Sequence, residues 1–434
     1  MLLTSVVLIG ALFLLLGSGF WIAPSMLLVG MLGMLLFTSS PTGMIMSTTI
    51  WGSSISWTLT ALPLFLWMGE ILYRSSLSRD LFSGLAPWMA RIPGRLLHVN
   101  VLGCAIFAAV CGSSAATSAT VGKISLPELK KRGYDERMSV GTLAGSGTLG
   151  LLIPPSIMMI VYGVAAEVSI AQLFIAGILP GLVLVGLFMA FVGGWALLNP
   201  GRMPSADAER AMSFREKVYR SRRLIPVLLL IGAVIGSIYT GVATATEAAA
   251  LGVVGSLLLS FFDGTLNRHT FTDGLRAAMV TSCMMTFILA CAAFLANAMG
   301  FTGLPMALAK GIGTLELSPI ALLAVLTLFY MILGCFLDGI SMVVLTTSII
   351  MPLIKASGFD LVWFGIYVVL VAEMAQITPP VGFNLFVLQA MTKRDIFNIA
   401  RSTLPFFMLL LVAVVLLTAF PGLATYLPSR MSAG

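Results

Sequence analysis

The chain has 434 residues, of which 59% are hydrophobic and only 9% are charged. Soluble globular proteins carry about 25% charged residues, so this composition excludes a soluble protein and predicts a polytopic α-helical membrane protein. The formal net charge of +7 comes from basic residues between apolar runs, where they set membrane topology, and gives no reason to expect a nucleic-acid partner.

Residues that could support catalysis are scarce. The two histidines, His98 and His269, lie beside expected loops, and the five cysteines are scattered through apolar segments without metal-ligand spacing. The chain has no Gly-x-x-x-x-Gly-Lys-Ser/Thr phosphate-binding motif. We therefore expect no enzyme, no cofactor and no transition-metal centre. An intramembrane protease, which would need a nucleophile beside a base, is disfavoured for the same reason.

The N-terminal part of the chain, over 1–69, contains no charged side chain. Its first apolar run lacks the basic start and small-residue cleavage site of a signal peptide, so we expect it to be a retained span. Apolar runs of about 20 residues predict spans at 2–17, 21–38 and 50–72. A basic, partly amphipathic stretch follows over 74–95.

The next two segments break the pattern of continuous spans. Residues 97–125 are apolar at both ends but small and hydroxyl-rich in the middle, which predicts a re-entrant hairpin. The apolar stretch 138–163 contains the pair Pro154-Pro155, which removes two backbone donors and forces the preceding residue out of helical geometry. In hydrocarbon the freed carbonyls need a polar or cationic partner, so this stretch predicts a broken helix that lines a site.

The second half repeats this plan after a span at 171–198 and a linker at 199–223, which has seven basic and three acidic residues and is expected in the cytoplasm. The expected segments of the second half are spans near 224–240, 246–262 and 277–299, a loop at 300–316, a hairpin at 320–354, a broken span at 361–390 around Pro379-Pro380, and a last span at 404–426.

Several landmarks recur at one constant offset in residue number, which we call the repeat offset. The pairs are Pro154 with Pro379, Pro127 with Pro352, Gly133 with Gly358, and Pro180 with Pro405. A fixed offset predicts two copies of one unit. We assign residues 1–198 to the first repeat, with scaffold helices over 1–96 and the hairpin and broken helix over 97–198. The second repeat covers 224–434, with scaffold helices over 224–316, the hairpin and broken helix over 317–403, and the last span.

The charges indicate that the two copies have opposite orientations. The segments 74–95 and 130–137 are basic, whereas their counterparts 300–316 and 355–360 carry one basic residue each; after the broken helices the bias is reversed, with none over 165–172 and three over 393–401. Under the positive-inside rule, equivalent loops then face opposite sides of the membrane. Inverted repeats with broken helices and hairpins predict a secondary transporter with its site near the midplane, and they disfavour a passive channel.

The chemistry of such a site needs mainly backbone carbonyls and hydroxyls, which coordinate Na⁺, and helix N-termini, which attract anions. In the first repeat the candidates are Gly150, Ile153 and Pro154 with the hairpin turn at Ser113 and Ser114. Their counterparts in the second repeat are Ala375, Thr378 and Pro379, with a hairpin turn near Gly334 and Asp338. The alternative for the glycines is close helix packing, and for the proline pairs a purely structural kink.

Three carboxylates lie at expected membrane depth: Glu247, Asp338 and Glu373. Each could bind a cation or relay protons, or could cap a helix; for Glu247 we favour the structural role. The repeat offset pairs Asp338 with Ser113 and Glu373 with Thr148, neither of which is acidic. A carboxylate is therefore not part of a symmetric site, which favours Na⁺ over protons as the coupling ion.

Together these motifs resemble the large membrane subunit of tripartite ATP-independent periplasmic (TRAP) transporters, over nearly the whole chain. The resemblance rests on five segments: 112–122 (GSSAATSATVG), 145–156 (GSGTLGLLIPPS), 173–181 (LFIAGILPG), 244–250 (TATEAAA) and 377–386 (ITPPVGFNLF).

The resemblance implies an elevator-type transporter that takes up an organic acid, such as a C4-dicarboxylate or a sugar or keto acid, across the bacterial inner membrane by Na⁺ symport. It also implies a small four-helix membrane subunit, expected as a separate chain, and a periplasmic substrate-binding protein. The implied Na⁺ ligands are Ser113, Ser114, Gly150, Ile153 and Pro154 for the first site, and Gly334, Ala375, Thr378 and Val381 for the second.

Relatives commonly have a hydroxyl where this chain has Ala375, so the second site is expected to be weaker. Candidate residues that face the substrate are Ser156, Ser341 and Asn384. The alternative is a stand-alone Na⁺- or proton-coupled anion symporter of the same superfamily, which needs no binding protein.

Overall fold

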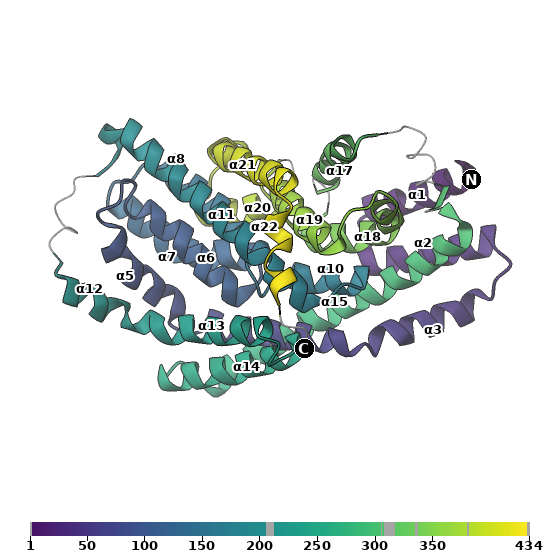
Figure 1. The fold of residues 1–434 in the computed structure, drawn as a ribbon, viewed down its shortest axis with the longest axis horizontal. Coiled ribbons are helices and arrows are strands. Elements are labelled where there is room, and N and C mark those ends of the chain that lie inside the picture. Colours follow the sequence, from purple (N-terminus) through teal and green to yellow (C-terminus); the bar gives the residue numbers. More distant parts are fainter. Residues whose placement is uncertain are drawn as a thin grey trace.

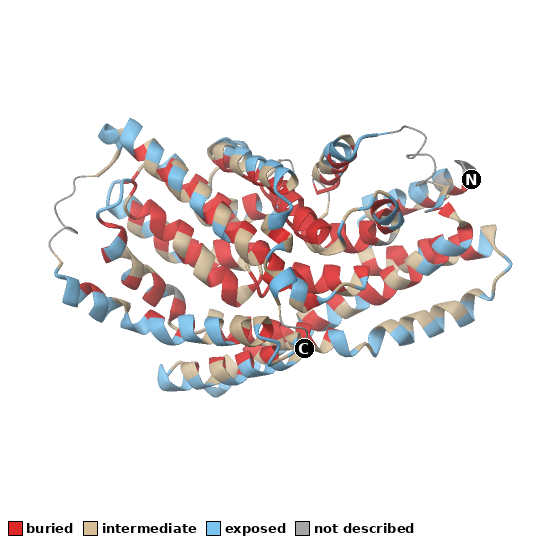
Figure 2. Cartoon of the chain, in the orientation of Figure 1, coloured by how far each residue is buried: buried red, intermediate tan, exposed pale blue. Residues whose placement is uncertain are grey.

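The computed structural model describes residues 2–204, 212–304, 306–307, 317–334, 337–379 and 382–431. Every regular element in these ranges is a helix (Figure 1). Buried residues concentrate where the helices cross the middle of the molecule, and exposed ones lie along its outer rim (Figure 2). The longer helices of the first half are α1 (Leu2–Gly17), α2 (Ile22–Phe37), α3 (Thr42–Ser54), α4 (Ala61–Tyr73), α5 (Leu77–Met89), α6 (Leu97–Cys111), α7 (Ser114–Lys131), α8 (Glu136–Gly147), α9 (Leu149–Leu152), α10 (Ile157–Ala166) and α11 (Ile170–Leu198).

A short helix, α12 (Phe214–Ser221), lies in the linker before the second half. The elements of the second half are α13 (Ile225–Tyr239), α14 (Ala245–Phe262), α15 (Arg268–Thr302), α17 (Pro319–Gly334), α18 (Gly339–Ala356), α19 (Leu361–Gln376), α20 (Phe383–Thr392), α21 (Ile396–Ala419) and α22 (Gly422–Thr425). In the described part, five helices are long and apolar enough to cross a membrane, or up to eight if each bent pair counts as one span. The protein is therefore a multi-pass membrane protein.

The prediction of a single continuous span at 50–72 is wrong. The chain forms α3, a short 3₁₀ helix (Trp57–Thr60) and α4, and the two parts meet at an angle of 51°. The Ser53 hydroxyl donates to the carbonyls of Thr49 and Ile50, and such back-bonding bends helices. Ser56 then takes an extended conformation with ψ of 122°, which ends the helix in the middle of the apolar run.

The last span also differs from the expected 404–426. Helix α21 starts earlier, at Ile396, because the Asp395 side chain accepts a hydrogen bond of 3.0 Å from the Phe397 N–H and caps it. It ends at Ala419, and Pro421 follows the C-cap residue Phe420. The span expected at 277–299 is also longer in the structure than predicted, because the Asn267 side chain caps α15 and the helix starts at Arg268.

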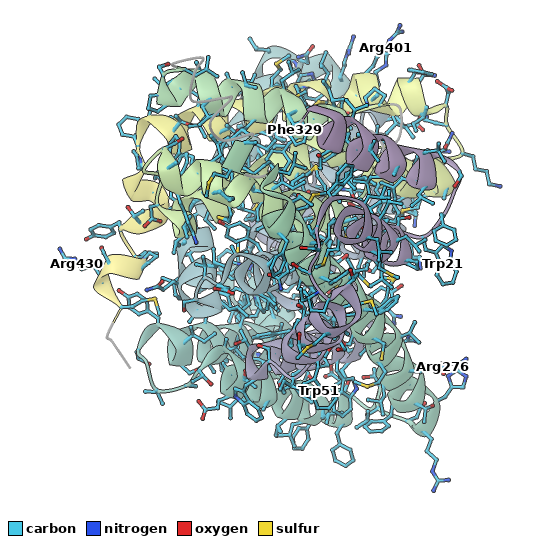
Figure 3. All side chains as sticks on the ribbon, turned by 90° about the vertical axis from the view of Figure 1, so that its right-hand side faces the viewer. Trp21, Trp51, Arg276, Phe329, Arg401 and Arg430 are labelled. Carbon is cyan, nitrogen blue, oxygen red and sulfur yellow. The ribbon has the colours of Figure 1, made fainter. Side chains whose placement is uncertain are left out.

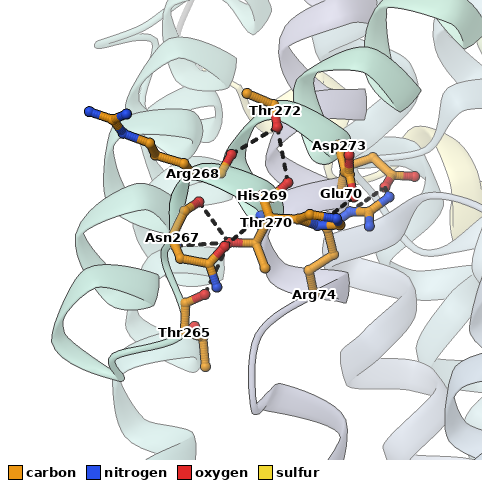
Figure 4. A network of polar contacts seen from close by, with 9 residues as sticks. All are labelled: Glu70, Arg74, Thr265, Asn267, Arg268, His269, Thr270, Thr272 and Asp273. Carbon is orange, nitrogen blue, oxygen red and sulfur yellow. Dashed lines mark hydrogen bonds and ion pairs between the residues drawn. The ribbon is translucent and has the colours of Figure 1, made fainter.

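Helix α15 is the central scaffold helix on one side of the molecule and packs against α2, α3 and α4 (Figure 1). Figure 4 shows how its first turn is stabilised. The Asn267 side chain accepts from Thr270 N–H at 2.8 Å, Thr270 Oγ1 accepts from Asn267 N–H at 2.9 Å, and His269 pairs with Asp273 at 2.8 Å. The same network contains the Glu70–Arg74 ion pair at the end of α4.

Large apolar side chains cover the rim as expected for a lipid-facing surface. Trp21 is 80% exposed and Trp51 70% exposed, and both point outward in Figure 3. Tryptophan is enriched at membrane–water interfaces, so these side chains are suited to contact lipid head groups.

Element bounds recur in the two halves at the repeat offset. Helices α7 and α18 both start and end at this offset, and α8 and α19 start at it. Gly133 and Gly358, which precede α8 and α19, have φ of 76° and 75°. The left-handed residues Glu167 and Lys393, which end α10 and α20, lie a single position away from the same register.

Candidate functional site

The first helix break lies between α8 and α10. The segments Glu136–Leu152 and Ile157–Ala166 meet at 41°, and Ile153 is extended, with ψ of 123°. Pro154 and Pro155 explain the break because neither can donate a helical hydrogen bond. Ser156 then caps α10: its hydroxyl accepts from Met159 N–H at 3.3 Å and donates to the Leu151 carbonyl at 2.5 Å.

The tip of the first hairpin, between α6 and α7, lies against this break. Gly112 ends α6 with φ of 62°, and its carbonyl accepts from Ile157 N–H at 3.4 Å. Gly150 faces the tip so closely that a Cβ on it would lie 2.5 Å from Ser114 N and 2.6 Å from Ser113 O. The structure thus brings Ser113, Ser114 and Gly150 together. Only a glycine permits this approach.

The second break follows α19. Ile377 and Thr378 leave the helix, the Thr378 hydroxyl donates to the Met374 carbonyl at 2.7 Å, and Gly382 N–H donates to the Thr378 carbonyl at 3.0 Å. Helix α20 then starts at Phe383. Val381, expected as a sodium ligand, lies outside the described residues.

The tip of the second hairpin meets the second break in a corresponding way. Gly334, at the end of α17, lies against the side chain of Ala375. Gly339, at the start of α18, is close to the amide of Gln376, 2.7 Å from the position of a Cβ. The structure therefore brings Gly334 and Ala375 together, with Thr378 further along the same break.

Asp338 caps α18 at this second tip. Its carboxylate accepts from Ile340 N–H at 3.2 Å, from Ser341 N–H at 3.3 Å and from the Ser341 hydroxyl. Ser113 occupies the equivalent place in the first hairpin, at the repeat offset, and caps α7 by accepting from Ala116 N–H. Glu247 is a cap as well: it is exposed and forms a capping box with Thr244 at 2.8 Å.

Glu373 is fully buried on α19 and reaches across to the other half of the chain. One carboxylate oxygen accepts from the Ser114 hydroxyl and, at 3.1 Å, from Leu151 N–H. The other oxygen is buried and has no hydrogen-bond partner among the described residues. Glu373, which belongs to the second half, thus bonds both to Ser114 at the first hairpin tip and to Leu151 beside the first helix break.

The expectation that a carboxylate is not part of a symmetric site stays a prediction. Glu373 has the non-acidic Thr148 as its counterpart at the repeat offset, and its contact with Ser114 and Leu151 joins the two halves asymmetrically. The signal available in the sequence was the acidic residue itself, in the apolar run of α19, because a charge at that depth needs a partner.

Further polar atoms are buried without a described partner close to the first tip. They include the hydroxyls of Thr117, Ser118 and Ser146 and both amide atoms of Asn384. Helix α7, which carries Thr117 and Ser118, packs against α8, α9 and α20, and Asn384 lies in the first turn of α20. Buried polar groups in native proteins have partners, so this cluster is suited to an ion, water or a polar solute.

The three residues expected to face the substrate have different environments. Ser156 and Ser341 are buried and already bonded within the caps of α10 and α18. Asn384 is buried with its amide available. Of the three, Asn384 is the one whose side chain can still bind a solute.

Both contacts offer hydroxyl, carbonyl and carboxylate oxygens, the donor set of hard cations rather than of transition metals. Helix α20 starts at the second break without a side-chain cap, so its first N–H groups can face an anion. At the start of α10 the N–H groups of Ile157 and Met159 are already bonded to the Gly112 carbonyl and the Ser156 hydroxyl. The arrangement can therefore hold a cation and an organic anion.

Comparison with known proteins supports a transport role. Residues 9–423 match the family described as "Tripartite ATP-independent periplasmic transporter, DctM component". The C4-dicarboxylate TRAP transporter large permease protein DctM of Pseudomonas aeruginosa is 35% identical over 378 residues, 87% of each chain. The ectoine/5-hydroxyectoine TRAP transporter large permease protein UehC of Ruegeria pomeroyi is 32% identical over 374 residues, 85% of each chain.

Another relative, the isethionate TRAP transporter permease protein DctMQ of Oleidesulfovibrio alaskensis, is 31% identical over 86% of this chain and 58% of its own length. Among solved structures, the Alcanivorax borkumensis YdaH transporter has a similar fold, with a TM-score of 0.67 over 96% of this chain and 99% of that one. Its sequence identity is 13%, so this likeness concerns the fold alone.

Proposed function

Because the chain belongs to the DctM component family of tripartite ATP-independent periplasmic transporters, we propose that it imports a small organic acid driven by an inward Na⁺ gradient. The observation that carries this proposal is the pair of contacts between a hairpin tip and a helix break. One joins Ser113 and Ser114 to Gly150, and the other joins Gly334 to Ala375. Unwound backbone of this kind at repeat interfaces is where secondary transporters coordinate Na⁺.

The first sodium site uses the backbone and hydroxyls of Ser113 and Ser114 with the carbonyls of Gly150, Ile153 and Pro154. Glu373 supplies a compensating negative charge, because its second carboxylate oxygen is buried without a described partner. The second site uses Gly334, Ala375, Thr378 and Val381. Ala375 has no hydroxyl, so this site is the weaker of the two.

The two halves act as inverted repeats, with residues 199–223 as a cytoplasmic linker. Support comes from the bounds of α7 and α18, which match at the repeat offset, and from the opposite charge bias of equivalent loops. Hairpins that enter from opposite faces suit an elevator motion, in which the hairpins and broken helices move against the scaffold that contains α15.

Family membership implies a small membrane subunit and a periplasmic binding protein as partners. The relatives are named for C4-dicarboxylates, isethionate and ectoine. We propose an organic acid as the solute here because the start of α20, which no side chain caps, offers N–H groups to an anion.

Reconstitution tests the proposal. Proteoliposomes that contain this chain, its small subunit and the binding protein encoded beside it should accumulate a labelled organic acid when Na⁺ is high on the side of the binding protein. Uptake without the binding protein would favour a stand-alone symporter, and uptake driven by a proton gradient alone would refute Na⁺ coupling.

A further inference from the structure

A basic cavity of about 770 Å³ lies at the end of the molecule where α5, α7 and α12 come together, away from the hairpin tips (Figure 1). Five basic side chains line it and a single acidic one: Arg79, Arg95, Lys131, Arg132 and Arg220 against Glu128. The described lining therefore carries a net charge of +4. Such a cavity attracts a multiply charged or strongly acidic group.

Three of the five basic residues lie on separate helices. Arg79 lies on α5, Lys131 ends α7, and Arg220 lies on α12. Neither Arg79 nor Lys131 forms an ion pair with another described residue, whereas Arg132 pairs with Glu128 at 3.3 Å and Arg220 with Glu216 at 3.4 Å. Packing α5 and α12 beside the end of α7 brings like charges together, which is unfavourable unless an anion lies between them.

Tyr134 adds a neutral donor. Its phenol oxygen accepts a hydrogen bond from Leu96 N–H at 3.3 Å, so its own hydrogen is available toward the cavity that it lines. Burial raises the pKa of Tyr134, so the hydroxyl stays protonated at neutral pH. Guanidinium groups with a hydroxyl donor are the usual partners of phosphate oxygens.

The surroundings indicate where this phosphate comes from. Apolar side chains, among them Phe82 and Ala86, line the same cavity. Beside it, Trp88 and Phe214 stack edge to face at 5.8 Å, and Trp88 Nε1 donates to the Ser221 hydroxyl at 2.7 Å. Phe214 is 72% exposed. Aromatic rings next to basic residues on short amphipathic helices are typical of the head-group level of a membrane.

We propose that this cavity binds the phosphate head group of an anionic phospholipid of the cytoplasmic leaflet, between α5, α7 and α12. Basic pockets between helices on this side of a membrane bind such head groups. The apolar lining can accommodate the adjoining glycerol and acyl chains, which free phosphate lacks. The bound lipid would hold the end of the first hairpin against α5.

The test measures binding of a fluorescent phosphatidylglycerol to the purified full-length chain in a neutral detergent. Each basic residue near an anionic head group contributes about fivefold to affinity, so Arg79→Gln with Lys131→Gln should weaken binding about 25-fold. The charge-preserving pair Arg79→Lys with Lys131→Arg should retain binding. Arg268→Gln with Arg401→Gln removes the same charge at exposed positions on α15 and α21, outside the cavity lining, and should leave affinity unchanged.

Three results would overturn the proposal. The first is equal binding of phosphatidylglycerol and phosphatidylcholine. The second is an equal loss in the control pair, which would indicate attraction by net charge alone. The third is displacement of the labelled lipid by inorganic phosphate as effectively as by unlabelled phosphatidylglycerol, which would assign the cavity to a free anion. Because the readout is binding, failure here leaves the transport proposal standing, and failure of Na⁺-driven uptake leaves this proposal standing.

Discussion

The substitution Gly150→Ala tests the contact between the first hairpin tip and the first break. The added Cβ would lie 2.5 Å from Ser114 N and 2.6 Å from Ser113 O, whereas ordinary contact begins at 3.4 Å. The tip must therefore move away by about 0.9 Å (3.4 − 2.5), and overpacking of this kind costs about 1–3 kcal/mol. If this cost applies to the Na⁺-bound state, the Na⁺ concentration for half-maximal uptake rises by about 5- to 150-fold.

Two measurements on the same variant check this value: Na⁺-dependent uptake in proteoliposomes, and the Na⁺ concentration that stabilises the purified protein against heat. Gly186→Ala on α11 is the matched control, since no atom lies within 4 Å of its Cβ position. It reports the gain of up to about 1 kcal/mol from replacing a helical glycine. Gly150→Val should abolish uptake in folded protein. A folded Gly150→Ala variant with wild-type Na⁺ dependence in both assays would refute the proposed site.

Three further changes test other parts of the structure. Thr378→Val removes the hydroxyl at the second break while keeping its shape and should raise the Na⁺ requirement of uptake; an unchanged Na⁺ titration would remove Thr378 from the site. Glu373→Ala leaves the Leu151 N–H without its buried acceptor, which should cost about 1–3 kcal/mol of stability in thermal unfolding, whereas Glu373→Gln keeps an acceptor and should lose less; equal losses would contradict the bridging role. Thr244→Ala breaks the capping box of α14 and should cost about 1 kcal/mol without changing the Na⁺ dependence of uptake; a changed dependence would show that this cap belongs to the transport machinery.

The local backbone chemistry of this protein could be read from the sequence. The two breaks lie at the two Pro-Pro pairs of the sequence, where neighbouring residues lack a backbone N–H donor. Single prolines, such as Pro180 and Pro405, lie inside continuous helices. The hairpin segments were expected for a similar reason, since a small, hydroxyl-rich centre between apolar ends suits a turn. Helices α7 and α18, separated by the offset read from the prolines, have equal lengths in the structure.

The helix ends that depend on a single side-chain hydrogen bond could not be predicted from the hydropathy of the sequence. The bend after α3 arises from hydroxyl back-bonding of Ser53, and the early start of α21 from the Asp395 cap. Hydropathy averages over about 20 residues, so it detects the apolar run but not a single hydrogen bond within it.

Tertiary structure alone decided which groups meet across the two halves. Glu373 bonds to Ser114, far away in the sequence, and the repeat offset does not predict this because it relates equivalent positions, such as Glu373 and Thr148, rather than positions in contact. The basic cavity likewise exists only because α5, α7 and α12 pack together. Residue type determines where the backbone must break, since the relevant bonds span a single helical turn. Contacts between distant segments depend on how the helices pack, which a one-dimensional pattern does not contain.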